Sequence, residues 1–568
     1  MVVLSYSISI QRPSWLPDPR IKAQRVNIGS GSILKLPRKN LDTSRQRRIG
    51  FAIFAILFAS YGYFHQGGGW NQNSRLNQVR AIVEKQQLEI NDYLHYQASV
   101  NSRGETKILP LKRSVGNETR SSLDSANTLD VSLFSGRFYP NKPPGTVFLA
   151  LPAYGLIYSL ESLLHVDATD WWIQTINSYL TNLFSVALVT ALGGLVFYFV
   201  SQRLFPALPT WTHVAATLTY GLGTMIFPFA TLFFDHDLVA TFSLCAFGLV
   251  LTKNRGGLES LRDTFGYFLV GVLCGLSILV NYTAILTTAC LLAYGFWTAK
   301  GKPMFVYGAL AGLVLPILLL MSYHASCFGS PYATANTYQY SMFRSPDSAF
   351  SGMLTLPSAT VAFELLFPYY RGLFFTSPVL LLTALGLVMM VRKPQCKPEA
   401  ILCAVIFAAH LLVNSAFNHW HAGWTVGPRY LIPALPFLVL PGAWLFTRLP
   451  RLTGTLALAS FCIMLLITAV EPQVPSAISN PLKDHVLRLV LGERLEVNGI
   501  SIDGPVSTNP IGVYESWNGP GESIRQAERK WHAFNLGELL WPGSRGSLAP
   551  LLLFISAALV YIRRVLGD

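Results

Sequence analysis

Long apolar runs follow one another from Gly50 to the C-terminus, separated by shorter polar and charged segments. Each run holds about 16–25 residues, long enough to cross the hydrocarbon core of a bilayer or nearly so. The runs are continuously apolar and lack the two-residue alternation of a membrane barrel strand. Because backbone groups in lipid must be hydrogen-bonded within their own segment, this pattern predicts membrane-spanning helices.

Twelve of these runs are predicted to be spans, so the expected fold class is an all-α polytopic membrane protein with about 12 transmembrane helices. They lie at about 49–65, 172–200, 210–232, 238–252, 265–280, 284–298, 304–322, 373–391, 399–416, 430–447, 453–470 and 547–562. Ten basic residues precede the first span, and the short basic loops recur on the same predicted side. Since positive loops favour the cytoplasm, both termini are predicted to be cytoplasmic and every long loop to lie outside.

The spans divide the chain into four predicted regions. They are a basic cytoplasmic tail interpreted as disordered (1–48), a membrane domain with a long outer loop at 66–170 (49–470), an outer polar segment or small module (471–546), and the last span with its cytoplasmic end (547–568). Within the outer loop, Gly145–His165 is long enough to cross the membrane. A crossing there would place the later basic loops outside, so this helix and a second at 74–90 are predicted to lie along the outer interface.

Composition and charge agree with this picture. Of the 568 residues, 51% are hydrophobic and only 13% are charged, whereas soluble globular proteins carry about 25% charged residues. The net charge of +14 would suggest nucleic acid on a soluble protein. The positive-inside rule explains its placement better, so no nucleic-acid partner is predicted. The seven cysteines form no CxxC pair, and we predict neither a metal site nor a disulfide framework.

Four clusters of polar residues lie in the predicted outer loops, and the first two fall in the long first loop. Gly67–Arg75 combines glycines with amide side chains and Arg75, which suits a phosphate and sugar hydroxyls; a turn that caps the next helix is the alternative. The second cluster begins at Asp130 and ends at Gly145. In it Lys142 precedes two prolines, a rigid mount for a lysine that meets a charged head group; a lysine snorkelling to the interface is the alternative.

The other two clusters adjoin later spans. Asp235-His236-Asp237 stands between two apolar spans, where charges are costly to keep. It offers a general base or a metal ligand, with a simple outer turn as the alternative. In Asn418–Tyr430, Trp424 suits stacking on a sugar ring and Arg429 a phosphate, although aromatic residues are also ordinary at a membrane interface.

The clusters resemble the GT-C class of membrane glycosyltransferases. The nearest likeness is to bacterial family 39-like enzymes of the protein O-mannosyltransferase and lipid A aminoarabinose transferase type. It rests on the long first outer loop, on NKPPG (Asn141–Gly145), on FDHD (Phe234–Asp237) and on GWTVGPRYLIPALPF (Gly423–Phe437). The resemblance covers about residues 50–450, most of the membrane domain.

The resemblance implies inverting transfer of a sugar from a polyprenyl-phosphate donor to a lipid, glycan or protein acceptor. An outer-loop carboxylate would act as the general base, and a basic cluster would stabilise the leaving phosphate. The family commonly carries an acidic residue just beyond the first span. In this chain that place reads Trp70–Arg75, without a carboxylate, and an amide accepts no proton as a base.

Each implied role therefore has several candidates. The candidates for the base are, in order, Asp130, Asp92 and Asp235. The candidates for binding the donor phosphate are Lys142, Arg75 and Arg429. The candidates for contact with the sugar or acceptor are Asn73, Tyr139, His236 and Trp424.

The expected partners are a polyprenyl-phosphate-linked sugar and membrane lipids, and the expected location is a bacterial plasma membrane. No cofactor is predicted with certainty, because Asp235 and Asp237 leave a divalent cation open. Two other functions remain as alternatives. One is a transporter or flippase of lipid-linked sugars, although the spans hold few charges. The other is a catalytically inactive GT-C-like scaffold, which the missing acidic residue near Asn73 favours.

Overall fold

The computed structural model describes residues 43–66, 68–94, 96–100, 106–110, 128–168, 170–254, 261–300, 302–339, 343, 348–491, 495–497, 500–502 and 533–567. The chain divides into two units, Met1–Gln46 and Arg47–Asp568. Most of the predicted basic tail therefore lies outside the described residues, as do much of the outer loop at 101–127 and most of the polar segment after residue 491. The second unit contains all the features discussed below.

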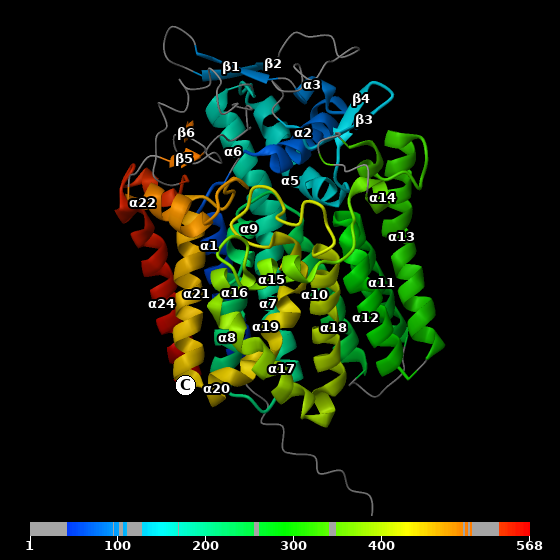
Figure 1. The fold of residues 1–568 in the computed structure, drawn as a ribbon, viewed down its shortest axis with the longest axis vertical. Helices are drawn as coiled ribbons and strands as arrows, with labels where there is room; N and C mark the ends of the chain where they lie inside the picture. Colours follow the sequence, from blue (N-terminus) through cyan, green and yellow to red (C-terminus); the bar gives the residue numbers. More distant parts are fainter. Residues whose placement is uncertain are drawn as a thin grey trace, which may run out of the picture. The chain divides into compact units, whose positions relative to one another are not determined.

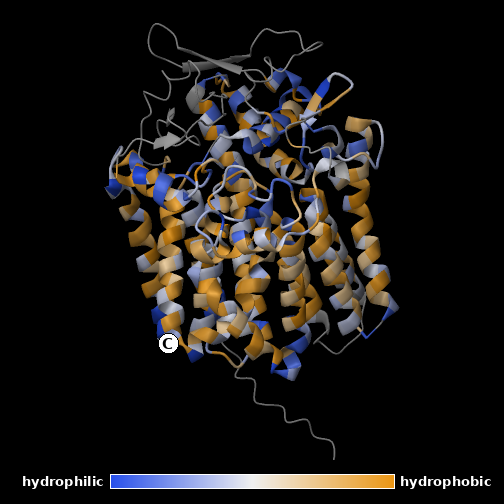
Figure 2. Cartoon of the chain, viewed as in Figure 1, coloured by the Kyte–Doolittle hydropathy of each residue, from blue (hydrophilic) through white to orange (hydrophobic). Residues whose placement is uncertain are grey.

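Helical segments occupy every stretch that the sequence predicts as a span (Figure 1). The main ones are α1 (Thr43–Gly62), α7 (Leu188–Leu204), α8 (Thr210–Leu222), α9 (Ile226–Ala230), α10 (His236–Asn254), α11 (Leu261–Val280), α12 (Ile285–Thr298), α13 (Pro303–Phe328), α17 (Thr383–Val391), α18 (Lys397–Asn414), α21 (Pro450–Val470) and α24 (Ala549–Gly567). Figure 2 shows that apolar residues dominate the long helices and that hydrophilic residues gather toward their ends.

Seven helical stretches among the described residues are long and apolar enough to cross a membrane. Six of them coincide with predicted spans, and the seventh is Gly145–Leu163, which the sequence analysis places along the interface. Three further apolar helices, His236–Thr252, Thr264–Val280 and Pro378–Val391, are shorter. The protein is thus a multi-pass membrane protein, while the count of about 12 spans and the interfacial placement of the Gly145 helix stay predictions.

Prolines interrupt two of the predicted spans. The tenth consists of η7 (Arg429–Ala434), α19 (Leu435–Val439), η8 (Leu440–Trp444) and α20 (Leu445–Arg448). Pro433, Pro436 and Pro441 fall inside this run, and each removes a backbone N–H from the hydrogen-bond ladder. The eighth span is similarly divided into α16 (Leu373–Thr376), η5 (Pro378–Leu382) and α17.

The segment predicted as the first outer loop folds against one end of the helices (Figure 1). It comprises α2 (Trp70–Lys85), α3 (Asn91–Leu94), β1 (Tyr96–Val100), β2 (Thr106–Pro110), β3 (Val131–Phe134), β4 (Arg137–Pro140) and α5 (Gly145–Leu163), and α6 (Trp171–Asn182) follows it. β3 and β4 pair antiparallel, with Phe134 opposite Arg137. Ser135 and Gly136 both have positive φ, the conformation that a two-residue hairpin loop favours.

The helix α2 differs from the amphipathic interfacial helix predicted at 74–90. It begins at Trp70, ends at Lys85, and is buried at every residue from Asn71 to Ala81. Its polar residues are therefore enclosed by protein, and this correction matters because Arg75 lies within the buried stretch. A helix end at Gln86, in the left-handed conformation, separates α2 from the rest of the predicted segment.

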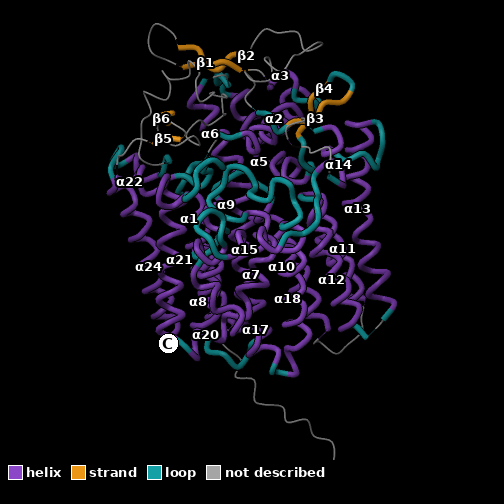
Figure 3. The backbone as a smooth tube through the Cα atoms, viewed as in Figure 1, coloured by secondary structure: helices purple, strands orange, loops and turns teal. Residues whose placement is uncertain are grey.

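The described parts of 471–546 lie against the membrane domain. They include η9 (Pro481–Leu487), α22 (Arg488–Leu491), β5 (Leu495–Val497), β6 (Ile500–Ile502) and η11 (Leu536–Leu539). His65 donates its backbone N–H to the carbonyl of Phe534 at 2.9 Å, and Thr425 donates to the carbonyl of Val474 at 2.9 Å. Figure 3 shows loops concentrated toward the same end of the helices as α2 and α5.

Candidate functional site

A buried ion pair joins α2 to the turn before α10. The Nη2 atom of Arg75 lies 2.8 Å from Oδ2 of Asp235, and the two side chains are 1% and 3% exposed. Asn281, just beyond α11, donates to the same carboxylate oxygen at 3.0 Å, while Asn71 accepts a hydrogen bond from Arg75. A buried pair of this kind is tolerated only when hydrogen bonds satisfy its remaining polar atoms.

The surrounding charges keep Asp235 ionised. Burial, the largest influence, raises the pKa of this carboxyl, but the charges of Arg75, His236 and Lys142 together outweigh it and lower the pKa to about 2. A carboxylate with so low a pKa is a weak base. Asp235 is therefore better suited to holding Arg75 in place than to accepting a proton.

Gln72 fixes the position of α2 against this turn. Its Oε1 accepts the backbone N–H of Phe233 at 2.7 Å, and its Nε2 donates to the carbonyls of Gln66 and Gly68 at 2.7 and 2.6 Å. Gly69 has φ of 84°, and a Cβ there would lie 2.6 Å from Oε1 of Gln473. The glycines thus allow the chain to turn tightly beneath residues 471–473 before α2 begins.

A second arginine also lies close to the turn before α10. Arg429, at the start of η7, lies with its guanidinium carbon 5.1 Å from the ring centroid of Phe234, and that of Arg75 lies 5.9 Å from the same centroid. His236 packs its ring 5.6 Å from that of Tyr430 and places Nδ1 3.4 Å from Oδ1 of Asp235. The FDHD turn and the GPRYL segment therefore meet.

Arg429 has no acidic partner within ion-pair distance among the described residues. Its Nε atom is buried and makes no hydrogen bond there. A half-buried guanidinium without a counter-charge favours an anion, and its planar donors match a phosphate. This cation is the feature of the site that most clearly calls for an anionic ligand.

Asp130 and Lys142 form the adjoining part of the site. Lys142 Nζ lies 3.8 Å from Oδ2 of Asp130, and Asn141 donates to Oδ1 at 3.5 Å. Ser74 of α2 donates to the backbone carbonyl of Asp130 at 2.6 Å. Gly145, at the start of α5, packs so closely on α11 that a Cβ would lie 2.6 Å from the Leu279 backbone. The NKPPG segment thus anchors Lys142 beside α2.

The remaining candidates lie elsewhere or take no visible part. Asp92 is 52% exposed and pairs with Lys85 at 2.6 Å on the surface. Tyr139 packs with Tyr323 and Phe328 in a separate apolar cluster, 5.4 Å from the Phe328 ring. Asn73 is buried within α2, and Trp424 is half-buried in the loop before Arg429. The candidates that gather are Arg75, Asp130, Lys142, Asp235, His236 and Arg429.

Two contributors escaped the sequence analysis. One is Asn281, which donates to Asp235 from just beyond α11. Arg371 is wholly buried and donates to the carbonyls of Tyr370, His421 and Gly423 at 2.9, 3.1 and 3.1 Å. Arg371 thereby clamps the loop that leads to Arg429. Its signal in the sequence is an arginine in an otherwise apolar and aromatic stretch, Phe367–Phe375.

The next question is whether the described residues could bind a metal ion. They contain no group of three or more His, Cys, Asp and Glu side chains that could hold a metal ion. The two carboxylate oxygens of Asp237 are buried and have no hydrogen-bond partner among the described residues. A divalent cation at Asp235 and Asp237 stays an untested expectation.

Comparison with known proteins finds similar folds at low sequence identity. The aminoarabinose transferase ArnT from Cupriavidus metallidurans, solved with undecaprenyl phosphate, is 15% identical, with a TM-score of 0.44 over 93% of this chain and 74% of that one. The apo oligosaccharyltransferase from Archaeoglobus fulgidus is 12% identical, with a TM-score of 0.45 over 81% of this chain and 59% of that one. Both are GT-C glycosyltransferases, so the predicted likeness recurs among solved structures.

The similarity to known proteins is limited to the fold. No protein-family model and no curated protein sequence matches the chain. At these TM-scores and identities the likeness carries no argument about chemistry. The function is therefore argued from the residues themselves.

Proposed function

We propose that this protein is an inverting glycosyltransferase. It moves a sugar from a polyprenyl-phosphate donor to an acceptor hydroxyl on the outer face of a bacterial plasma membrane, with both chain termini in the cytoplasm. The single observation that carries the proposal is the half-buried Arg429, which lies over the same Phe234 ring as Arg75, has a buried Nε without a hydrogen-bond partner, and has no carboxylate partner of its own among the described residues. An anionic ligand held there, next to apolar helices, fits a phosphate attached to a lipid chain.

The basic residues around Phe234 have different proposed roles in binding the leaving phosphate. Arg75 is neutralised by Asp235 and acts chiefly as a fixed hydrogen-bond donor. Arg429 supplies the charge that compensates the phosphate as the sugar–oxygen bond breaks. Lys142, partly exposed and 3.8 Å from Asp130, reaches the sugar side of the phosphate. Donors fixed in a water-poor site stabilise such charge more strongly than donors in water.

Asp130 is the proposed base. It is buried at the edge of the cluster and touched by Asn141 and Lys142, neither of which neutralises it as closely as Arg75 neutralises Asp235. In the proposed step, Asp130 accepts the proton of the acceptor hydroxyl while the acceptor oxygen attacks the anomeric carbon. The bond from that carbon to the phosphate oxygen breaks, and polyprenyl phosphate leaves with the electron pair.

The test is release of polyprenyl phosphate from a panel of polyprenyl-phosphate sugars by purified protein in nanodiscs. Arg429→Ala is expected to lower turnover by about 10²–10³-fold, the usual cost of losing one fixed donor to a developing anion. Asp130→Asn is expected to lower it by about 10²–10⁴-fold, the range that general-base catalysis supplies. Both variants are expected to unfold at the wild-type temperature.

Asp92→Asn is the matched control, because it removes an exposed carboxylate from the same outer loop. Its turnover should equal that of the wild type. Turnover that survives Asp130→Asn would remove Asp130 from the role of base. Donor bound in an Arg429-dependent way, but never consumed, would favour the inactive scaffold or the transporter over the transferase.

A further inference from the structure

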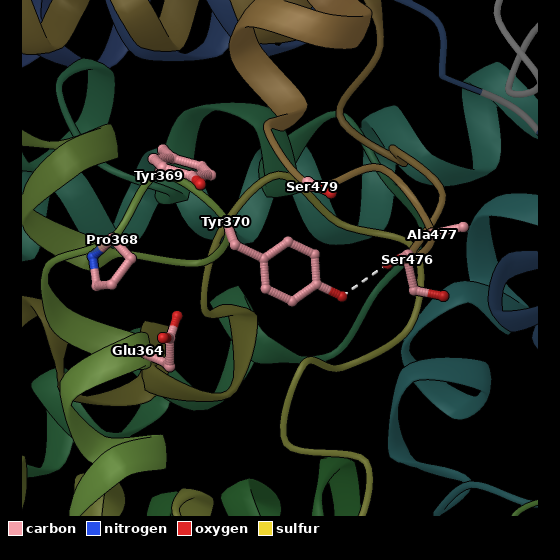
Figure 4. A pocket seen from close by; sticks show the side chains of 7 residues that line it. All are labelled: Glu364, Pro368, Tyr369, Tyr370, Ser476, Ala477 and Ser479. Atoms are coloured by element: carbon pink, nitrogen blue, oxygen red, sulfur yellow. Dashed lines mark hydrogen bonds between the residues drawn. The ribbon is translucent and has the colours of Figure 1, made fainter. Parts of the chain in front are cut away.

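A separate cavity lies between the loop after α15 (Ala359–Leu366) and the segment that follows α21. It has a volume of about 330 Å³, and its lining includes Glu364, Pro368, Tyr369, Tyr370, Ser476 and Ser479. Figure 4 shows Glu364, Pro368 and Tyr369 on one side of the Tyr370 ring and Ser476 on the other. A volume of this size falls within the ordinary range of small-ligand pockets, roughly 300–1,000 Å³.

The lining selects against anions. Glu364 is its one charged side chain, and neither lysine nor arginine contributes to it. A carboxylate accepts hydrogen bonds from two neighbouring hydroxyls, and tyrosine rings offer flat apolar faces beside polar hydroxyls. These groups suit a ring rich in hydroxyls, such as a sugar, and they do not suit the phosphate that the Arg429 region would bind.

The outer surface beside the cavity is apolar. Phe363 is 55% exposed and Phe367 47%. The rings of Phe363 and Phe367 lie 5.3 Å apart, and Phe367 lies 5.3 Å from Phe374. Phe363 immediately precedes Glu364 in α15, and Phe367 directly follows the end of that helix, so the apolar strip of Phe363 and Phe367 adjoins the polar cavity. A ligand with a polar head and an apolar chain would contact both surfaces at once.

The walls of the cavity are joined directly to the proposed transferase site. The hydroxyl of Tyr370 donates to the carbonyl of Ser476 at 2.7 Å, which links the two walls (Figure 4). The next residue, Arg371, holds the carbonyls of His421 and Gly423, and Val474 accepts from Thr425. Both walls therefore hold the loop that ends at Arg429. A ligand in the cavity would therefore affect the loop that ends at Arg429, where the donor phosphate is expected to bind.

We propose that this cavity binds the hydroxyl-rich head group of a membrane-anchored acceptor, with the strip of Phe363 and Phe367 in contact with its apolar chain. Only the description of the ligand as an acceptor rests on the proposed transferase activity. Binding of such a lipid follows from the cavity and the strip, whether or not transfer occurs. A soluble glycan would fill the cavity without using the strip.

Binding is tested on the full chain by native mass spectrometry from phosphatidylcholine nanodiscs that contain a small fraction of glucosyl diacylglycerol. The wild type should retain the glycolipid in preference to phosphatidylglycerol. Glu364→Gln and Tyr369→Ala should each retain about tenfold less, since a hydrogen bond to a charged group corresponds to about that factor. Phe363→Ser with Phe367→Ser should lower retention without changing the cavity lining.

Tyr332→Ala is the matched control, because Tyr332 is an exposed tyrosine outside the cavity, and it should retain glycolipid like the wild type. Equal retention by the wild type, Glu364→Gln and Tyr369→Ala would overturn the proposal. Displacement of the glycolipid by methyl glucoside at comparable concentration would also overturn it, because a soluble head group would then suffice.

The transfer assay separates this proposal from the proposed function. Glu364→Gln should raise the KM for a glycolipid acceptor about tenfold. If no variant or wild type consumes donor, but Glu364-dependent glycolipid binding persists, the transferase fails and the binding site stands. If donor is consumed and the KM for the acceptor does not change, the site fails and the transferase stands.

Discussion

The helix α2 contains two buried arginines, Arg75 and Arg80, which meet their carboxylates in different ways. Arg80 pairs with Glu84, four residues later on the same helix, at 3.0 Å. Tyr93 and Tyr154 donate to the same carboxylate at 2.7 and 2.5 Å. Arg75 instead pairs with Asp235, from a turn 160 positions away in the chain. One helix thus belongs to a local network and to a long-range one.

The difference lies in the balance of charge around each pair. In the Glu84 network, defined by Arg80, Glu84, Tyr93 and Tyr154, one cation meets one anion and the tyrosines complete the hydrogen bonds. In the Asp235 cluster, defined by Arg75, Asn71, Asp235 and Asn281, one cation also meets one anion, but Nε of Arg75 is buried without a hydrogen-bond partner among the described residues. A further cation, Arg429, lies over the same phenylalanine as Arg75. A balanced network stabilises the fold, whereas an unbalanced one also leaves room for a ligand's charge.

The largest expected effect comes from breaking the Asp235 pair. Asp235→Asn keeps the shape of the side chain but leaves Arg75 buried without a counter-charge, which should cost about 3–5 kcal/mol of stability. The measurement is thermal or denaturant unfolding in detergent. A matched double variant, Arg75→Met with Asp235→Leu, should recover most of the stability and still release no polyprenyl phosphate. An Asp235→Asn variant as stable as the wild type would show that the pair is not structural.

The architecture of the membrane domain was largely predictable from the sequence. Apolar runs longer than a turn of helix have few options in lipid, so each predicted span coincides with helical structure. The same pattern could not predict that α2 is enclosed by protein. Its residues Asn71–Arg75 are polar, and only the fold around them supplies partners such as Asp235 and the backbone carbonyl of Asp130. Local periodicity does not report on partners that are distant in the sequence.

The candidate site was predictable in part for the same reason. Arg75, Asp235 and Arg429 stood out as charges beside apolar spans, and the fold brings them to one phenylalanine. Glu84 did not stand out, because an acidic residue at the end of a helix resembles an ordinary solvated charge. Arg371 did not stand out either. Two of its three bonds to backbone carbonyls depend on a loop 50 residues later.

A smaller effect is expected from the Glu84 network. Glu84→Gln keeps an acceptor for the tyrosines but removes the charge that pairs with Arg80, which should lower stability by about 1–3 kcal/mol. Turnover per folded molecule should stay within about twofold of the wild type, because the network only supports α2. Unfolding and single-turnover release measure the two quantities separately. A loss of turnover larger than the loss of folded protein would show that the Glu84 network contributes to turnover together with the Asp235 cluster.

The matched control for Glu84→Gln is Asp92→Asn, which breaks the exposed pair with Lys85. Exposed pairs contribute at most about 1 kcal/mol, and usually less. The difference between the two variants therefore measures what burial adds to an ion pair on the same loop.

The smallest expected effect is the pH dependence of the stability that Asp235 contributes. The pKa of Asp235 is lowered to about 2 in the fold, below the value of about 3.9 expected for an unfolded chain. A lowered pKa adds stability that is fully present above the unfolded value and is lost as the pH falls toward the folded one. Between pH 5 and 8, the stability difference between wild type and Asp235→Asn should therefore vary by about 0.1 kcal/mol or less. Below about pH 4 the difference should shrink. A difference that changed steadily between pH 5 and 8 would mean that Asp235 titrates there, and the carboxylate would then become a rival to Asp130 as the base.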